Sequence, residues 1–266
     1  MNDSVFQSGK IMADGLSFSW AAATDIGKQR QENQDAFFVE PDIGLFLVSD
    51  GMGGHRGGAL AANIVVEDLP VMIETSLAKL KSRKTKPVSA LLKKNIIEQN
   101  RQLRMEAFSK TGYKDMGTTV VLMLLRSRRC YIANLGDSRI YRFRRGRLNQ
   151  LSKDHSVVAE LISKGQIQPE DTENHAAANQ ITHYIGMEEK AVPHVRSFAL
   201  AQADRLLLCT DGLTGMLSDT DIAAILRTVP KADIAAKSLI DAANTAGGHD
   251  NITVILVDWL PPPAGN

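Results

Sequence analysis

The feature that most constrains this sequence is a repeated one: short apolar, β-rich segments that begin or end at an aspartate. The run Leu-Phe-Leu-Val-Ser leads directly into Asp50-Gly51, and the run Leu-Leu-Leu-Cys-Thr leads into Asp211-Gly212. Further aspartates border other such segments. A chain of this kind is expected to build a β-rich core whose strand ends carry carboxylates. The acids concerned are Asp35, Asp50, Asp137, Asp211 and Asp250.

Strands and helices are both expected, but they do not alternate strictly along the chain. This order favours an α+β fold in which helices cover antiparallel sheets. We expect one domain over residues 18–260, a flexible tail over residues 1–17 and a second tail over residues 261–266. Strands are predicted at residues 36–39, 44–49, 118–125, 129–134, 138–143, 205–210 and 252–259, and helices at residues 59–80, 89–108, 154–164, 219–227 and 232–245.

The composition argues for a folded protein and against two classes of partner. Hydrophobic residues make up 44% of the 266 positions, enough for a sizeable core. The 31 basic and 30 acidic residues leave a net charge of +1, which gives no electrostatic case for nucleic acid or an anionic membrane. Both cysteines, Cys130 and Cys209, lie in apolar runs, which fits a reducing compartment. We therefore predict a cytoplasmic monomer.

Carboxylates at strand ends could be projected into one cleft. Taken singly, each Asp-Gly could be only a turn, and Asp137 or Asp250 could simply cap a loop. If the acids converge, however, like charges and burial raise their pKa values unless cations are present. Four carboxylates, those of Asp35, Asp50, Asp211 and Asp250, balance two divalent ions. Oxygen ligands suit Mg²⁺, Mn²⁺ or Ca²⁺, and the lack of a Cys/His cluster disfavours structural zinc.

Several short segments occur in an order that is itself informative. Their sequence and spacing resemble the motifs of the PP2C-type (PPM family) metal-dependent protein serine/threonine phosphatases, in their bacterial form. The resemblance runs from about Trp20 to Trp259. The segments are Asp-Ile-Gly-Lys-Gln-Arg-Gln-Glu-Asn-Gln-Asp (25–35), Val-Ser-Asp-Gly-Met-Gly-Gly-His (48–55), Met-Gly-Thr-Thr (116–119), Asn-Leu-Gly-Asp-Ser-Arg (134–139), Leu-Ser-Lys-Asp-His-Ser (151–156), Cys-Thr-Asp-Gly-Leu (209–213) and Gly-His-Asp-Asn-Ile-Thr (248–253).

The resemblance implies a particular fold and a particular metal centre. The fold would be a four-layer α-β-β-α sandwich, with two antiparallel β-sheets flanked by helices. The centre would hold two Mn²⁺ or Mg²⁺ ions, with a third ion bound more weakly. The implied ligands are Asp50 bridging both ions, the Gly51 carbonyl, Asp211 and Asp250, with Asp35 reaching the second ion through water and Asp137 helping to hold the third.

The resemblance also implies a reaction. A water bridging the two ions would attack phosphorus directly, releasing phosphate from phosphoserine or phosphothreonine on proteins and opposing a serine/threonine kinase. The residues expected to act in catalysis are Arg30, Asp35 and His55. Arg30 would grip the phosphate with a forked pair of donors. His55 would protonate the leaving oxygen, or would have only a packing role, because Met52 directly follows Gly51 where some relatives carry histidine.

The sequence departs from the family pattern at His183, and it is also compatible with two alternative functions. His183 stands where arginine is common, beside a region at 164–191 that forms a flap in relatives, so substrate preference could differ. The alternatives are a phosphatase of a non-protein phosphate ester and an inactive relative that only binds phosphoproteins. A tyrosine-phosphatase mechanism is excluded by the lack of a Cys-x₅-Arg loop. A kinase or nucleotide-binding fold fits poorly, because the glycine-rich segment at 53–58 lacks the Walker lysine and the GxGxxG spacing.

Overall fold

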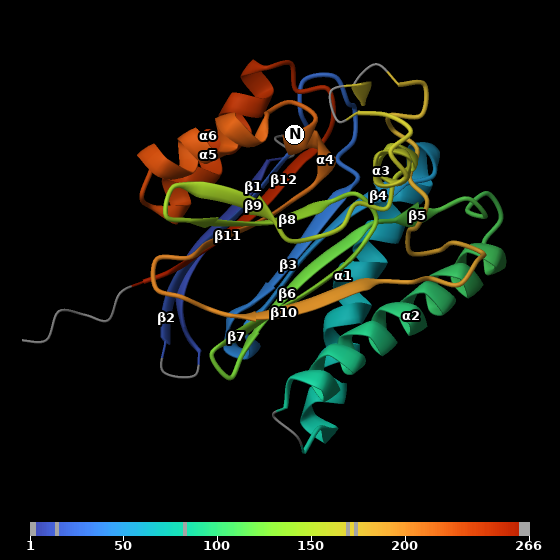
Figure 1. The fold of residues 1–266 in the computed structure, drawn as a ribbon. Coiled ribbons are helices and arrows are strands. Elements are labelled where there is room, and N and C mark those ends of the chain that lie inside the picture. Colours follow the sequence, from blue (N-terminus) through green and yellow to red (C-terminus); the bar gives the residue numbers. More distant parts are fainter. Residues whose placement is uncertain (1–3, 14–15, 82–83, 169–170, 173–174, 261–266) are drawn as a thin grey trace, which may run out of the picture.

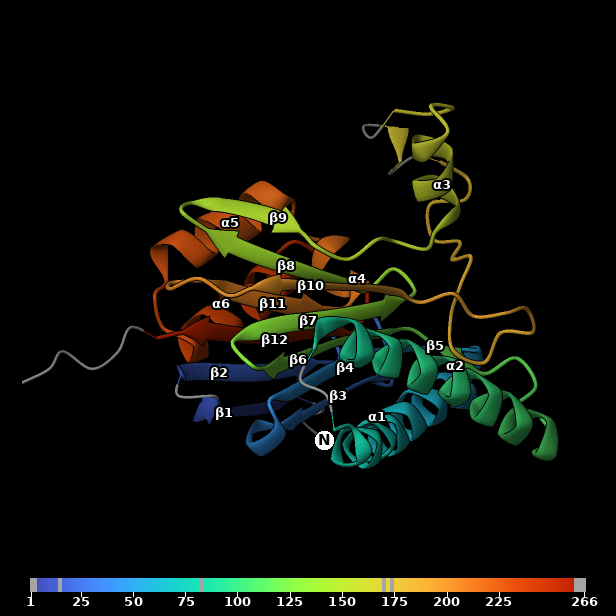
Figure 2. The same ribbon diagram turned by 60° about the horizontal axis from the view of Figure 1, so that its bottom comes forward.

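The computed structural model describes residues 4–13, 16–81, 84–168, 171–172 and 175–260, with the backbone alone for residue 13 and residues 54–56. Two antiparallel sheets stack face to face, and helices cover the outer face of each (Figures 1 and 2). This arrangement confirms the predicted α-β-β-α sandwich. Within the described part of the chain, no helix combines the length and the apolar character that crossing a membrane requires.

The first sheet has the strand order β1-β2-β12-β11-β8-β9. Helices α5 and α6 cover it. The bounds are β1 (Val5–Ala13), β2 (Leu16–Asp25), β12 (Ile252–Trp259), β11 (Arg205–Cys209), β8 (Arg139–Arg144), β9 (Arg147–Gln150), α5 (Asp219–Thr228) and α6 (Ala232–Thr245).

The second sheet has the order β10-β7-β6-β4-β3, and the short β5 pairs with β4. The long helices α1 and α2 pack on its outer face. The bounds are β10 (His194–Ala199), β7 (Arg129–Leu135), β6 (Val120–Arg126), β4 (Leu45–Met52), β3 (Asp35–Glu40), β5 (Gly117–Thr118), α1 (Gly54–Lys79) and α2 (Thr85–Ser109). Three short helices connect strands: η1 (Pro41–Ile43), α3 (Val157–Ser163) and α4 (Asp211–Thr214).

Strand β6 shows why the central segments are continuously apolar. Its odd residues, such as Val121 and Met123, lie in the core between the sheets, whereas Leu122 and Leu124 lie under α1 and α2. Successive side chains of a strand point to opposite faces, so a strand buried on both faces needs apolar residues at every position. The middle strands were predictable for that reason.

The prediction of a flexible tail over residues 1–17 is wrong for its described part. Strand β1 pairs with β2 along its whole length, from Val5 opposite Thr24 to Ala13 opposite Leu16. An edge strand carries a weak sequence signal because much of it faces solvent, and Phe6 and Met12 are both exposed. The predicted tail at 261–266 lies outside the described residues.

Three further strands were not predicted: β2, which lies inside the first sheet, and β9 and β10, which end their sheets. The elements that were predicted differ from expectation only in their boundaries. Helix α3 begins at Val157 rather than at Asp154, because the Ser156 side chain accepts a hydrogen bond from the Ala159 amide and caps the helix there. Gly165 follows this helix with a left-handed backbone, φ 68°, which glycine adopts readily.

Candidate metal centre

The predicted acids come from strands of both sheets and meet at one end of the sandwich. Asp35 begins β3 and pairs with Asp50 of β4 in the second sheet. In the first sheet, Asp211 follows β11 and Asp250 precedes the antiparallel neighbour β12, so both lie at the same sheet edge. A cleft of about 1060 Å³ lies between these ends, and its lining includes Arg30, Asp50, Gly51, Asp137, Asp211 and Asp250.

Two glycines allow the loops around the cleft to approach this closely. A Cβ atom at Gly51 would lie 2.1 Å from the Gly58 carbonyl oxygen in the first turns of α1. A Cβ at Gly212 would lie 1.9 Å from the Asn251 carbonyl oxygen. Neither position can therefore accept a larger residue without moving backbone. The Asp-Gly pairs are thus packing requirements as well as candidate ligand positions.

Neighbouring threonines hold the backbone of Asp50 in place. The Thr119 amide donates to the Asp50 carbonyl over 2.8 Å, and the Asp50 amide donates to the Thr119 hydroxyl over 3.1 Å. The Thr118 hydroxyl adds a second bond to the same carbonyl, at 2.7 Å. Because this backbone is anchored on both sides, the Asp50 side chain is presented to the cleft by a rigid strand end.

The cleft is strongly unfavourable for several negative charges at once. Burial raises the pKa of Asp50 well above its usual range, and the charge of Asp211 raises it further. Burial and the nearby Asp250 likewise raise the pKa of Asp211, whose carboxylate is within hydrogen-bonding reach of Asp50. Burial, and then Asp211, raises the pKa of Asp137 to about 7. Without cations, some of these carboxylates must therefore stay protonated near neutral pH.

The donor set suits hard divalent cations. It consists of carboxylates and the Gly51 carbonyl, in a polar cleft with room for water. In the part of the chain that the structure describes, no three His, Cys, Asp or Glu side chains form a ready set of direct ligands for one ion. Mg²⁺ usually keeps several water ligands and takes only one or two carboxylates. The residues therefore fit ions whose shells are completed by water.

Arg30 lies at the mouth of the cleft. Its Nη2 atom pairs with Asp250 Oδ2 over 2.6 Å, and its side chain remains 52% exposed. An exposed ion pair of this kind contributes little to stability. The guanidinium therefore lines the mouth of the cleft and can exchange its ion-pair partner at small cost.

Asp35 is placed differently from the other acids. Its Oδ2 atom accepts hydrogen bonds from Thr253 over 2.7 Å and from Thr210 over 2.9 Å. Burial raises its pKa well above the usual range, and these hydroxyls oppose that rise. It stands behind the residues that line the cleft, and its proposed contact with an ion through water stays a prediction. The side chain of His55 lies outside the described residues, so its role also stays a prediction.

Several site residues were not predicted, and all of them are polar residues that hold the acids in place. Thr119, Thr210 and Thr253 are described above. The Asn251 side chain accepts from the Gln34 amide over 2.8 Å and donates to the carbonyls of Ile26 and Glu32 over 2.9 and 3.0 Å. Asn251 thereby fixes the loop that carries Arg30. A signal existed in the sequence for Thr210 and Asn251, which directly border Asp211 and Asp250, whereas Thr119 and Thr253 lie at the beginning of apolar strands and carried no such signal.

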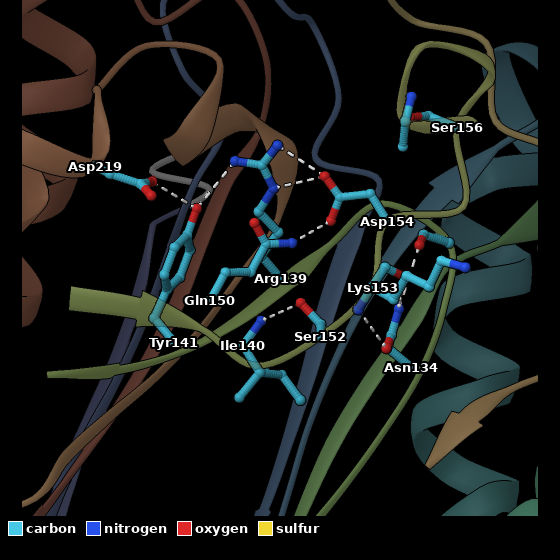
Figure 3. Close-up of polar contacts among 12 residues, drawn as sticks. Asn134, Arg139, Ile140, Tyr141, Gln150, Ser152, Lys153, Asp154, Ser156 and Asp219 are labelled. Carbon is cyan, nitrogen blue, oxygen red and sulfur yellow. Dashed lines mark hydrogen bonds and ion pairs between the residues drawn. The ribbon is translucent and has the colours of Figure 1, made fainter. Parts of the chain in front are cut away.

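Arg139 is a second cation near the acids, and it was not predicted to matter. Its Nε atom donates to Asp154 over 2.9 Å and its Nη1 atom to the Tyr141 hydroxyl over 3.0 Å (Figure 3). The Tyr141 hydroxyl in turn donates to Asp219 over 2.9 Å, and Gln150 donates to Asp154 over 2.6 Å. Because Asp154 already pairs with Arg139, this guanidinium does not replace the cations that the cleft requires.

Comparison with known proteins agrees with this geometry. The family model described as Protein phosphatase 2C matches residues 26–242. The serine/threonine phosphatase stp of Listeria welshimeri is 37% identical over 238 residues, covering 88% of this chain and 93% of that protein. The solved structure of the Streptococcus agalactiae serine/threonine phosphatase superimposes with a TM-score of 0.83 at 35% identity, covering 92% of this chain and 100% of the other.

A further solved structure bears on the metal ions. It is the catalytic domain of the serine/threonine protein phosphatase PstP in complex with two manganese ions, with a TM-score of 0.72 and 29% identity, covering 92% of this chain and 99% of that one. The family match spans most of the chain, and the relatives match it over nearly their full length. This chain belongs to the protein phosphatase 2C family.

Proposed function

We propose that this enzyme removes phosphate from phosphoserine and phosphothreonine residues of other proteins. The observation that carries the proposal is the group of buried, mutually repelling carboxylates that both sheets supply to one cleft. The names of its relatives point to the same substrates. A relative that only binds phosphoproteins is not favoured, because every predicted carboxylate is present and the cleft that they line is open.

The protein depends on divalent metal ions, and we assign two Mn²⁺ or Mg²⁺ ions to the cleft. Asp50, the Gly51 carbonyl, Asp211 and Asp250 would hold them, with Asp35 acting through water. Asp137, at the side of the cleft, would help to hold a third and weaker ion. When bound, such ions make water a nucleophile at neutral pH and stabilise charge on phosphoryl oxygens.

The remaining work falls to the chain's own residues. Arg30 would exchange Asp250 for two oxygens of the substrate phosphate, because its planar fork matches that geometry. Neither cysteine can act as a nucleophile: burial raises the pKa of Cys209 to about 12 and that of Cys130 well above its usual range. Hydrolysis therefore proceeds without a covalent cysteinyl intermediate.

The partners follow from this activity. The substrates would be products of a serine/threonine kinase that this enzyme opposes. A monomeric state, a cytoplasmic site of action and the absence of nucleic-acid and membrane partners all stay predictions.

Metal removal tests the proposed function. We expect hydrolysis of p-nitrophenyl phosphate and of a phosphothreonine peptide to stop in EDTA and to return with added Mn²⁺ or Mg²⁺. Circular dichroism in EDTA is the control that the fold persists. Full activity after exhaustive chelation would refute the metal assignment. Activity on p-nitrophenyl phosphate without activity on any phosphopeptide would favour a non-protein phosphate ester.

A further inference from the structure

A second polar cavity lies away from the acidic cleft, and its lining is almost entirely arginine. It has a volume of about 430 Å³ and is lined by Arg142, Arg144, Arg145, Arg147 and Asn149. These residues belong to β8, β9 and the turn between them. We call the four arginines, together with the neighbouring Arg196 of β10, the arginine groove.

The groove forms where the edge strands of the two sheets come together. In β8, Tyr141 and Phe143 pack under α5 and α6, so Arg142 and Arg144 project toward the other sheet. There the Arg142 guanidinium lies 5.4 Å from the centre of the Phe198 ring of β10. Figure 2 shows β10 beside β8 at this side of the sandwich. The groove is thus built by both sheets.

The positive charges of the groove are only partly balanced by acidic residues of the described chain. Among the described residues, the salt bridges of these five arginines are limited to Arg144 with Asp204. The Nε atom of Arg142 is buried and has no hydrogen-bond partner in the described chain. Burial, and then the neighbouring Arg144, lowers the pKa of Arg142. Clustered guanidinium groups with an unpartnered donor form a site that an anion would stabilise.

The backbone of the turn also bears on this site. Arg145 and Gly146 connect the paired residues Arg144 and Arg147 in a two-residue turn, with φ values of 51° and 77°. Asn or Gly takes this left-handed conformation more readily than a long side chain does. Arginine therefore stands at a position that local backbone preference does not explain.

The chemistry favours carboxylates and phosphates carried by a protein segment. The guanidinium fork matches both groups. The small volume suits one or two acidic side chains rather than a nucleic-acid duplex. The structure shows one aromatic ring here, Phe198, and Arg142 already covers it, so no stacking platform for bases is presented in the described residues.

The groove and the catalytic cleft share strand β8. Asp137 precedes this strand and Arg144 ends it, seven positions later. At about 3.3 Å per residue the two lie roughly 20 Å apart. An extended peptide would span that distance with about six residues.

Building on the proposed function, we propose that the arginine groove docks an acidic segment of the phosphoprotein substrate about six residues from the phosphorylated residue. The groove would raise the affinity for such substrates without taking part in the chemistry. Its effect would be seen in KM and would weaken with salt, as expected for exposed charge pairs.

The test compares phosphoserine peptides that carry four glutamates, or four glutamines, six residues before or after the phosphoserine. The variant Arg145→Asn/Arg147→Gln removes two charges and places asparagine where the turn favours it. The control Lys93→Gln/Lys94→Gln removes two exposed charges from α2. Exposed ion pairs are individually weak, so two of them together should change kcat/KM by about twofold to thirtyfold.

We expect the wild type and the lysine control to prefer a glutamate peptide by that factor and the arginine variant to lose most of the preference through KM. All three should hydrolyse p-nitrophenyl phosphate equally. Equal kcat/KM on glutamate and glutamine peptides in the wild type would overturn the docking proposal and leave the proposed function intact. A second outcome would also overturn it: the wild type binds single-stranded RNA and the arginine variant does not, while the wild type shows no preference between glutamate and glutamine peptides.

A binding measurement separates the docking proposal from the proposed function. Fluorescence anisotropy with a labelled, unphosphorylated glutamate peptide needs no catalysis. We expect it to show binding that the arginine variant weakens and the lysine control keeps. If the peptide binds in this way while no phosphopeptide is hydrolysed, the proposed function fails and the groove stands. If it binds wild type and variant equally, the groove assignment fails.

Discussion

At the two ends of the neighbouring strands β11 and β12, buried aspartates lie in opposite electrostatic surroundings. At one end, Arg205 pairs with Asp258 through two contacts of 2.9 and 3.0 Å, and both side chains are buried. At the other end, Asp211 lies against Asp50 and Asp250. Burial raises the pKa of both Asp211 and Asp258, but only Asp258 has an arginine bonded directly to it to oppose that rise.

This difference separates a structural acid from a functional one. The Asp258 carboxylate completes a closed pair whose arginine also donates to the Val229 carbonyl over 2.6 Å and to that of Leu226. The Asp211 carboxylate faces an open cleft among like charges, which costs stability unless ions from solution bind there. Charge repulsion among aspartates therefore remains at the Asp211 end of these strands, whereas Arg205 neutralises the aspartate at the other end.

The largest effect, on catalysis, is expected from a substitution at the end of the strands that carries Asp211. The substitution Asp211→Asn should lower kcat on p-nitrophenyl phosphate by about 10³-fold, since metal ions supply several kcal/mol of transition-state stabilisation. The same variant should be at least as stable as the wild type in EDTA, because one repelling charge is gone. Kinetics and thermal melting measure the two quantities. A near-normal rate would remove Asp211 from the site.

A substitution at the end that carries the Arg205–Asp258 pair should have the opposite effect: it should lower stability and leave the metal dependence unchanged. The substitution Arg205→Ala leaves Asp258 buried without a partner and should lower the free energy of unfolding by about 3–5 kcal/mol. The protein that remains folded should keep its dependence on divalent metal ions. Urea denaturation and metal titration provide the measurements, with Lys93→Ala as the exposed control. A loss of activity at unchanged stability would contradict the comparison.

The smallest effect should come from Asp137, at the side of the cleft. Its pKa in the folded protein is about 7, above the ordinary value of 3.8, so the folded state binds the extra proton. In EDTA, the wild type should therefore lose stability relative to Asp137→Asn as pH rises from about 4 to 7, and the difference should stay constant above that.

Melting curves of the two proteins between pH 4 and pH 8 measure this difference. Parallel curves over the whole range would show that Asp137 does not titrate in this way. With metal present, Asp137→Asn should lower activity while leaving the two tighter ions bound, and metal titration by calorimetry would reveal any loss of those ions.

Much of the fold was predictable because burial leaves a direct mark on local sequence. The strands β4, β6 and β11 are apolar at nearly every position, since both of their faces are covered. The edge strands β1, β9 and β10 were missed because a half-exposed strand can carry almost any residue. The same reasoning explains why residues 5–13 resembled a tail. Strand β2 was also missed although most of it is buried, because its run of alanines, Ala21 to Ala23, has a low strand propensity.

The acidic residues of the candidate site could be predicted from the sequence, but the residues that hold them in place could not. A single Asp-Gly after a strand could be only a turn, but Asp50 and Asp211 stand out because several apolar segments of one chain border an aspartate in this way. The hydroxyls of Thr210 and Thr253, which bind Asp35 from two different strands, become a pair only when β11 and β12 lie side by side.

The sequence alone therefore determined which residues could carry the chemistry, because charge, oxygen ligands and strand periodicity are properties of the local chain. The tertiary structure decided which acids face an open cleft, which are paired with arginine, and where arginines gather into a groove. Those outcomes depend on which strand ends become neighbours across two sheets, and the energy of a charge depends on the burial and the partners that only the assembled fold provides.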